Sequence, residues 1–271
     1  MGRSERGMAE EGVPSDGSQP GPMEGREPSD EARAVLFDLD DTLMAHREAV
    51  GEALLGHLRA LGHPYDPSNA DAEVAYWRAL EEQHYHRYLG GEIGYDEQRR
   101  ERARDFAVRH GVALAVEERE PWFRAYFERY EASWRLYDDV LPSLDELERR
   151  IPDVRFGVIT NGELDRQLRK LDAIGVRDRF DLVVASGEVG VTKPDARIFR
   201  IACERLRVQP KRAVYVGDRL LTDAVGATRA GLTGVWLDRY GDTVCDDERS
   251  TADALNISRI TSLGQLPQLV G

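Results

Sequence analysis

Short apolar runs alternate with amphipathic stretches along most of this chain, and this alternation limits the possible folds more than any other feature. Several runs are apolar throughout and rich in Val and Ile, as is typical of strands covered on both faces. Amphipathic helices separate them, and Gly175 and Gly231 stand where helices commonly end. The pattern predicts an α/β fold with a doubly wound parallel sheet. Strands are expected at 34–38, 155–160, 182–186, 213–217, 233–237 and 257–260, and helices at 144–150, 164–174, 195–206 and 223–230.

The interval 45–134 interrupts this alternation. It holds no convincing strand but four amphipathic helical stretches, near 47–61, 71–89, 95–110 and 118–134. Because the interval is far longer than a simple crossover needs, we predict an all-helical domain inserted into an α/β core of residues 34–44 and 135–271. Its aromatic residues are expected to form its own core, and the basic run 99–104 to be a solvated helix face.

Composition argues against several classes of function. The formal net charge of -13 disfavours nucleic acid as a partner. No apolar stretch approaches the roughly 18 residues that a membrane span needs, and no signal-peptide core follows Met1. Cys203 and Cys245 lack metal-type spacing, so we expect free thiols and a cytoplasmic location. Residues 1–33 lack apolar periodicity and are expected to be a disordered tail.

Polar side chains directly follow four of the predicted strands. Because the carboxyl ends of parallel strands meet at one rim near the topological switch point of the sheet, we expect these side chains to form one site. The groups are Asp38, Asp40, Asp41 and Thr42 after the first strand; Thr160, Asn161 and Gly162 after the second; Lys193 after the third; and Asp218 and Asp223 after the fourth.

This set of groups fits metal-assisted phosphoryl transfer. Carboxylates supply oxygen ligands for Mg²⁺, amides and hydroxyls suit phosphate oxygens, and a carboxylate can act as the nucleophile. Acids at the end of a buried strand are costly unless a cation receives them. Lys193 is one of three lysines among 37 basic residues, which favours a site that needs a compact ammonium group.

With these motifs the chain resembles the haloacid dehalogenase-like (HAD) superfamily of aspartyl-phosphate phosphotransferases. The motifs are Asp38-x-Asp40-x-Thr42, Thr160-Asn161-Gly162, Lys193-Pro194-Asp195, and Gly217-Asp218 followed by Asp223. The resemblance covers residues 34–262 and implies a Rossmann-like core. The helical insertion is similar to the superfamily's type-one cap, which closes over the active site.

The resemblance implies a role for each acid of the first motif. Asp38 would attack phosphorus and form an aspartyl-phosphate. Asp40 would protonate the leaving oxygen and then take a proton from the hydrolytic water. Mg²⁺ would be held by the carboxylates of Asp38 and Asp218 and by the backbone carbonyl of Asp40. Asp41 is expected to face solvent or to cap the following turn.

The remaining motif residues would serve the phosphate group. Thr160 and the backbone around Asn161 and Gly162 would hold its oxygens, and Lys193 would neutralise its charge. The resemblance further implies that Asp223 orients Lys193 or a metal-bound water, and Thr42 is counted as a supporting residue.

The expected activity is that of a Mg²⁺-dependent phosphatase for a small phosphorylated metabolite, in the branch of nucleotidases and sugar-phosphate phosphatases. Dehalogenation is disfavoured because those relatives lack the acid at the Asp40 position, and phosphonate cleavage because no lysine lies between Asp38 and Lys170. A phosphomutase stays open, as does a non-enzymatic phospho-accepting signalling module. No nucleic-acid or membrane partner is expected, and the chain would be a monomer or a homodimer.

Overall fold

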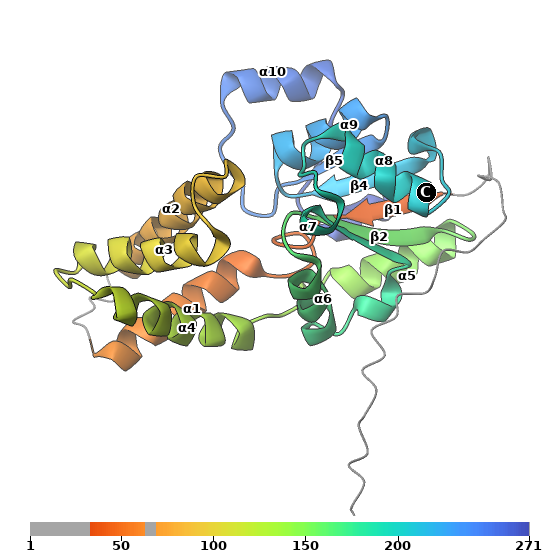
Figure 1. The fold of residues 1–271 in the computed structure, drawn as a ribbon. Coiled ribbons are helices and arrows are strands. Elements are labelled where there is room, and N and C mark those ends of the chain that lie inside the picture. The colour runs from red at the N-terminus through yellow and green to blue at the C-terminus, as the bar shows by residue number, and fades with distance from the viewer. Residues whose placement is uncertain (1–32, 63–68, 271) are drawn as a thin grey trace, which may run out of the picture.

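The computed structural model describes residues 33–62 and 69–270, so the expected tail lies, apart from Arg33, outside the described residues. A six-stranded parallel sheet forms its centre (Figure 1), with the strand order β3-β2-β1-β4-β5-β6. This order confirms the doubly wound α/β fold and places the topological switch point between β1 and β4. The strands are β1 (Ala34–Phe37), β2 (Arg155–Thr160), β3 (Leu182–Ala185), β4 (Ala213–Gly217), β5 (Thr233–Leu237) and β6 (Ser258–Ile260).

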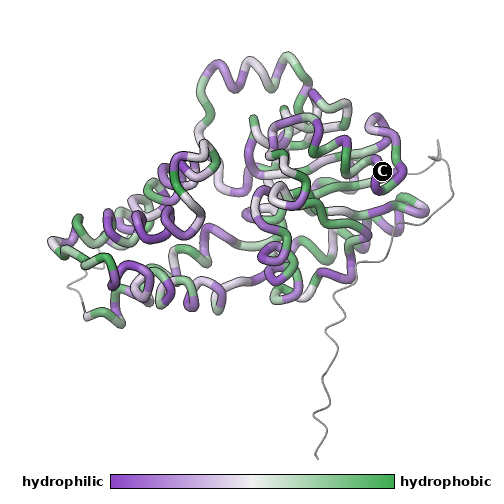
Figure 2. Tube along the Cα trace, viewed as in Figure 1, coloured by the Kyte–Doolittle hydropathy of each residue, from purple (hydrophilic) through white to green (hydrophobic). Residues whose placement is uncertain are grey.

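Alternate residues of β1 belong to two different hydrophobic cores. Val35 and Phe37 pack in one core with residues of α5, α6 and α11, whereas Ala34 and Leu36 pack in the other with residues of α8 and α9. The sheet is therefore covered on both faces, which explains why β1 is apolar throughout. Figure 2 shows this concentration of apolar residues along the strands.

Helices α1 to α4 form a separate group beside the sheet, which we call the helical bundle (Figure 1). Aromatic rings fill its centre, as expected: Trp77 is fully buried, with ring centroids 5.3 Å from Phe106 and 4.7 Å from Tyr126. That residues 45–134 form a domain of their own stays a prediction. The bundle helices are α1 (His46–Leu61), α2 (Ala70–Leu89), α3 (Tyr95–Arg109) and α4 (Val116–Ala132).

The other helices agree with the sequence pattern in part. The expected helix 144–150 begins four residues earlier, and the expected helix 223–230 is preceded and partly replaced by a π-helical turn, η4 (Leu220–Val225). Three further helices, α7, α10 and α11, were not expected. The helices outside the bundle are α5 (Val140–Arg150), α6 (Leu164–Ala173), α7 (Ser186–Val189), α8 (Ala196–Arg205), α9 (Gly226–Ala230), α10 (Asp246–Ala254) and α11 (Leu266–Val270).

Two short chain segments connect the bundle to the sheet. They run antiparallel: the N–H of Ala45 donates to the carbonyl of Arg135, and the N–H of Tyr137 donates to the carbonyl of Leu43, each at 3.0 Å. Among residues 33–62 and 69–270, no helix combines the length and apolarity needed to cross a membrane.

Candidate active site

A cavity of about 1030 Å³ lies between the helical bundle and the carboxyl ends of the strands. Residues at or after the carboxyl ends of β1 to β5 line one side of it, and residues of α1 to α4, α6 and α10 line other parts of its wall. Of the site residues expected from the sequence, those in its wall are Asp38, Asp40, Asp41, Thr160, Asn161, Gly162, Lys193, Asp218 and Asp223. Thr42 is not among them.

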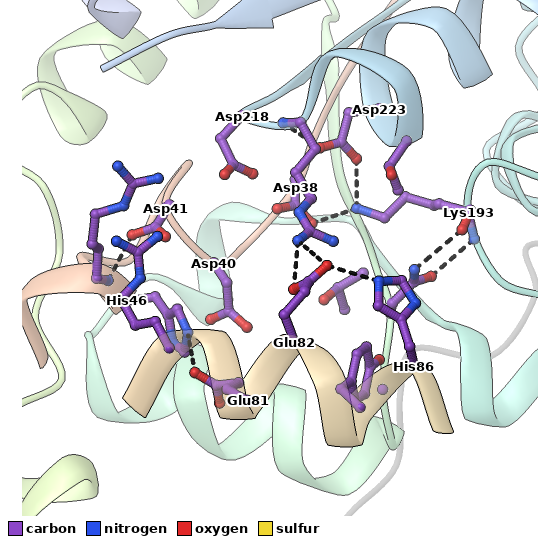
Figure 3. Close-up of a pocket in the computed structure, with 18 of the residues that line it drawn as sticks. Asp38, Asp40, Asp41, His46, Glu81, Glu82, His86, Lys193, Asp218 and Asp223 are labelled. Carbon is purple, nitrogen blue, oxygen red and sulfur yellow. Dashed lines mark hydrogen bonds and ion pairs between the residues drawn. The ribbon is translucent and has the colours of Figure 1, made fainter. Parts of the chain in front are cut away.

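Asp38 and Lys193 form a buried ion pair at the switch point (Figure 3). The Lys193 ammonium donates to Asp38 Oδ1 at 2.5 Å, to Asp223 Oδ1 at 2.8 Å and to the Tyr215 hydroxyl at 2.9 Å. Burial raises the pKa of Asp38 to about 7, against the lowering effect of Lys193 and with a further rise from Asp223. The charges of Asp223 and Asp38 outweigh burial and raise the pKa of Lys193, so this lysine stays charged.

Three carboxylates face this single ammonium group. One oxygen each from Asp38, Asp218 and Asp223 lie within 4.8 Å of one another. Asp223 is already engaged, because its oxygens accept from Lys193, from the Tyr215 hydroxyl and from the Arg219 N–H.

Asp218, in contrast, makes no side-chain hydrogen bond or ion pair with the described residues. Burial and the charges of Asp38 and Asp223 raise its pKa well above the ordinary value. Such an excess of negative charge, built from oxygen donors, fits a divalent cation of the Mg²⁺ type.

Asp40 points toward the helical bundle rather than toward this acidic group (Figure 3). Its two carboxylate oxygens accept from the Lys170 ammonium of α6 at 2.7 and 2.6 Å. Burial alone would raise the pKa of Asp40, but the charges of Lys170 and His46 outweigh it and lower the pKa.

Bundle residues surround this second ion pair. His46 lies 2.7 Å from the Tyr130 hydroxyl through Nδ1 and 3.8 Å from Glu81 through Nε2. Glu81 in turn pairs with Arg102 Nη1 at 3.0 Å. Although burial would lower it, the carboxylates of Asp40 and Glu81 raise the pKa of His46.

The loop after β2 uses its polar groups in two ways. Asn161 is held against the backbone of Lys193: it accepts from the Lys193 N–H at 2.9 Å and donates to the Lys193 carbonyl at 3.3 Å. The N–H of Gly162 donates to Ser186 Oγ at 2.8 Å. The Thr160 hydroxyl, at the end of β2, forms no hydrogen bond within the described residues and lines the cavity. Of the two polar side chains here, that of Asn161 is engaged and that of Thr160 is available to a ligand.

Asp41 and Thr42 are both buried. Asp41 was expected either to face solvent or to cap the next turn, and it does the second. It is 7% exposed, and its carboxylate accepts from the Arg47 N–H in the first turn of α1 at 2.7 Å. Thr42 is fully buried, and its hydroxyl has no partner among the described residues. Its place is in the packing behind the cavity.

The basic run 99–104 is not the solvated helix face that its composition suggested. Arg102 is 4% exposed, and its guanidinium lies over the Trp77 ring at 4.5 Å. The partly buried Glu81 of α2 pairs with it, and the sequence pattern of α3 alone does not reveal this partner.

Sequence reasoning missed several residues of the cavity, above all Lys170, His46, Glu81 and Arg102, and also Tyr215, which contacts Lys193 from behind the cavity wall. One signal was available. The chain has three lysines, and Lys170 and Lys193 are both buried at this site, whereas Lys211 is exposed. The rarity that singled out Lys193 therefore also applied to Lys170.

Comparison with known proteins gives the family. A family profile described as haloacid dehalogenase-like hydrolase matches residues 32–231. The chain is 34% identical to a glyceraldehyde 3-phosphate phosphatase of Methanopyrus kandleri, over 76% of this chain and 84% of that protein. It is 32% identical to a ribulose-1,5-bisphosphate 5-phosphatase of Halopiger xanaduensis, over 88% of this chain and 99% of that protein.

A solved structure supports the fold. The magnesium-bound HAD-hydrolase YfnB of Bacillus subtilis superposes with a TM-score of 0.70 at 20% identity, over 89% of this chain and 99% of that one. The sheet order, the groups at the strand ends and the matching profile agree, and the chain belongs to the haloacid dehalogenase-like hydrolases.

Proposed function

We propose that this hydrolase is a Mg²⁺-dependent phosphatase that acts on a small phosphorylated metabolite through an aspartyl-phosphate at Asp38. The observation that carries the proposal is the contact of Asp38 with Lys193, beside the unpaired carboxylate of Asp218. Relatives over most of the chain are named as phosphatases of small sugar phosphates, which supports the same substrate class.

In the first step, an ionised Asp38 oxygen attacks phosphorus and the bond from phosphorus to the leaving oxygen breaks. Asp40 donates the proton that the leaving oxygen takes up. Lys193 balances the negative charge on Asp38 and on the transferred group, and Asp223 with Tyr215 holds its ammonium in place.

In the second step, water attacks the phosphorus of the aspartyl-phosphate and Asp40 accepts its proton. Inorganic phosphate leaves, and Asp38 and Asp40 return to their starting states. Thr160 is placed to donate its hydroxyl to a phosphate oxygen, because that hydroxyl has no other partner among the described residues. The Asn161 side chain has a different task in this proposal, which is to position the Lys193 backbone.

The carboxylates of Asp38 and Asp218 would hold Mg²⁺, together with the Asp40 carbonyl, which none of the hydrogen bonds of this turn uses. The ion would supply positive charge for the phosphate oxygens. The helical bundle would act as the cap, since it forms the wall of the cavity opposite the strand ends. The free thiols of Cys203 and Cys245 fit a reducing compartment such as the cytoplasm.

The test is phosphate release from an aryl phosphate by the full-length protein, with Mg²⁺ and after chelation. We expect release that chelation abolishes, no turnover by Asp38→Asn, and a loss of about 10²- to 10⁴-fold in Asp40→Asn. Asp165→Asn, an exposed acid on α6 outside the cavity wall, is the matched control and should keep full activity. Absence of release by the wild type would refute the phosphatase, and turnover by Asp38→Asn would refute its nucleophile.

Metal binding has a readout that does not depend on turnover. Mg²⁺ that binds only the folded protein raises its melting temperature. We expect this rise in the wild type and in Asp165→Asn, and none in Asp218→Asn. An equal rise in Asp218→Asn would show that the ion is held by ligands other than Asp218.

The other candidates predict different products. A phosphomutase would convert a sugar phosphate to its isomer without releasing phosphate, and a phospho-accepting module would take up one phosphoryl group without turnover. Sustained phosphate release excludes both.

A further inference from the structure

Two arginines come together in the wall of the cavity, one from the bundle and one from α6. Arg99 and Arg166 both line the cavity, and their guanidinium groups lie over the same two rings. The Arg99 Cζ is 4.5 Å from the Tyr95 centroid and 4.8 Å from that of Phe127. For the Arg166 Cζ the corresponding distances are 4.8 and 5.1 Å. The two cations therefore lie near the same two rings, close enough that, with burial, the charge of Arg99 lowers the pKa of Arg166.

These arginines lack the close counter-charges that Lys170, Lys193 and Arg102 have. Arg166 forms no ion pair within the described residues, and the nearest carboxylate to Arg99 is that of the exposed Asp96, at 3.9 Å. Nη2 of Arg99 is buried without a hydrogen-bond partner. By contrast, Lys170, Lys193 and Arg102 each contact a carboxylate within 3.0 Å. Two adjacent, partly buried and unneutralised cations are costly unless an anion binds between them.

The proposed reaction of the phosphoryl group does not use this pair. That group is served by Lys193 and Thr160 on the sheet side of the cavity. Arg166 instead lies four residues before Lys170 on α6, which places the two side chains on the same face about one turn, or roughly 5 Å, apart. Lys170 contacts Asp40, the proposed proton donor to the leaving oxygen. The pair therefore lies on the side where the leaving group must extend.

Gln167 adds a second unused group at this place. It is 4% exposed, lines the cavity, and its Oε1 has no partner among the described residues. The Gln167 amide group lies against Gly162 in the loop after β2, so this buried acceptor is available to a polar ligand on the strand-end side of the cavity.

We propose that Arg99 and Arg166 bind a second anionic group of the substrate, a carboxylate or a further phosphate carried by the leaving group. This inference rests on the proposed phosphatase function and specifies its substrate class. Guanidinium groups fit the purpose because each presents a planar fork of donors to two oxygens of an anion, and stacking on Tyr95 and Phe127 fixes the planes of both.

The test compares matched pairs of substrates. Phosphoglycerate is compared with glycerol phosphate, and a hexose bisphosphate with the hexose monophosphate, so that the two arms separate a carboxylate from a phosphate. We expect the wild type to favour the anionic member of at least one pair by tenfold or more in kcat/KM. Arg166→Gln and, independently, Arg99→Gln should lower that ratio by about tenfold or more, mainly through KM, as the loss of a hydrogen bond to a charged group would.

The matched control is Arg169→Gln, an exposed arginine of the same helix, which should leave the ratio unchanged. Arg166→Lys keeps the charge without the fork and should give an intermediate ratio. The inference is overturned if neither anionic member is preferred, or if Arg166→Gln and Arg99→Gln slow both members of a pair equally. Melting temperatures of the variants identify any that fail to fold, and the two arginines lie on different helices, so one failure leaves the other informative.

The proposed function fails separately, through absence of aryl phosphate hydrolysis. In that case calorimetric titration with phosphoglycerate and with the hexose bisphosphate still tests the pair of arginines. Weaker binding of these ligands by Arg166→Gln than by Arg169→Gln supports the inference, and equal binding overturns it.

Discussion

At the scale of single residues, the site divides its charges between two lysines with different partners. Lys193 forms ion pairs with Asp38 and Asp223, whereas Lys170 forms its ion pair with Asp40. The two acids of the first motif are thereby set apart: the pKa of Asp38 is raised to about 7, while that of Asp40 is lowered. These two shifts run opposite to the proposed roles, because the nucleophile must be ionised and the proton donor must be protonated. A bound Mg²⁺ would lower the pKa of Asp38, and the negative charge of a bound phosphate group would raise that of Asp40.

Lys170→Met tests this division. Removal of the ammonium group withdraws the charge that lowers the pKa of Asp40, so this pKa rises. The limb of the pH–rate profile that Asp40 controls should therefore move to higher pH. Lys211→Met, at an exposed lysine, should leave the profile in place. A profile of Lys170→Met that stays in place or moves to lower pH would show that Lys170 does not set the pKa of Asp40.

At the scale of elements, the strand ends were predictable and the bundle side of the cavity was not. Four of the strands are short, largely apolar and followed by a polar motif, so local sequence was enough to bring Asp38, Thr160, Lys193 and Asp218 to one rim. His46, Glu81 and Arg99 lie on three different helices whose polar faces look alike in sequence. Their meeting depends on how α1, α2 and α3 pack, which helical periodicity does not specify.

The π-helical turn after β4 is a second feature that sequence alone did not reveal. It brings Asp223 back over Gly217, so closely that a Cβ at Gly217 would lie 2.4 Å from the Asp223 Cγ. Glycine at the end of β4 is therefore required for Asp223 to reach Lys193. π-Helical turns are frequently found at functional sites.

Gly217→Ala should consequently lower both stability and activity. The added methyl group must displace Asp223, which we expect to reduce the free energy of unfolding by about 1–3 kcal/mol and to slow phosphate release because Lys193 loses a partner. Gly51→Ala, within α1, is the matched control. The nearest atom to the added Cβ would be Val74 Cγ1 at 3.6 Å, and alanine favours a helix more than glycine does. Thermal melts and phosphate release check both variants. A Gly217→Ala protein as stable and active as Gly51→Ala would contradict the close packing.

At the scale of the whole molecule, the cavity has a connection on one side and a closing contact on the other. The connection is the pair of antiparallel segments at Ala45 and Arg135. Across the cavity, Arg219, which follows β4, contacts both oxygens of Glu82 on α2 at 2.7 Å (Figure 3). Both side chains are about half exposed, at 51% and 45%. An ion pair this exposed contributes no more than about 1 kcal/mol.

Such a weak contact is suited to an enclosure that must open for every substrate molecule. Its removal should shift the balance between closed and open positions of the bundle by no more than about fivefold, with little change in melting temperature. Spin labels at Val108→Cys on α3 and Leu269→Cys on α11, both exposed sites, in a Cys245→Ser background would report the distance between bundle and sheet. Arg219→Gln should lengthen or broaden that distance distribution. Arg197→Gln, which removes an ion pair remote from the bundle, should not. Identical distributions in the two variants would mean that contacts other than the Arg219–Glu82 pair, such as those of Arg47 with Asp242 and of Tyr88 with Glu163, hold the bundle over the site.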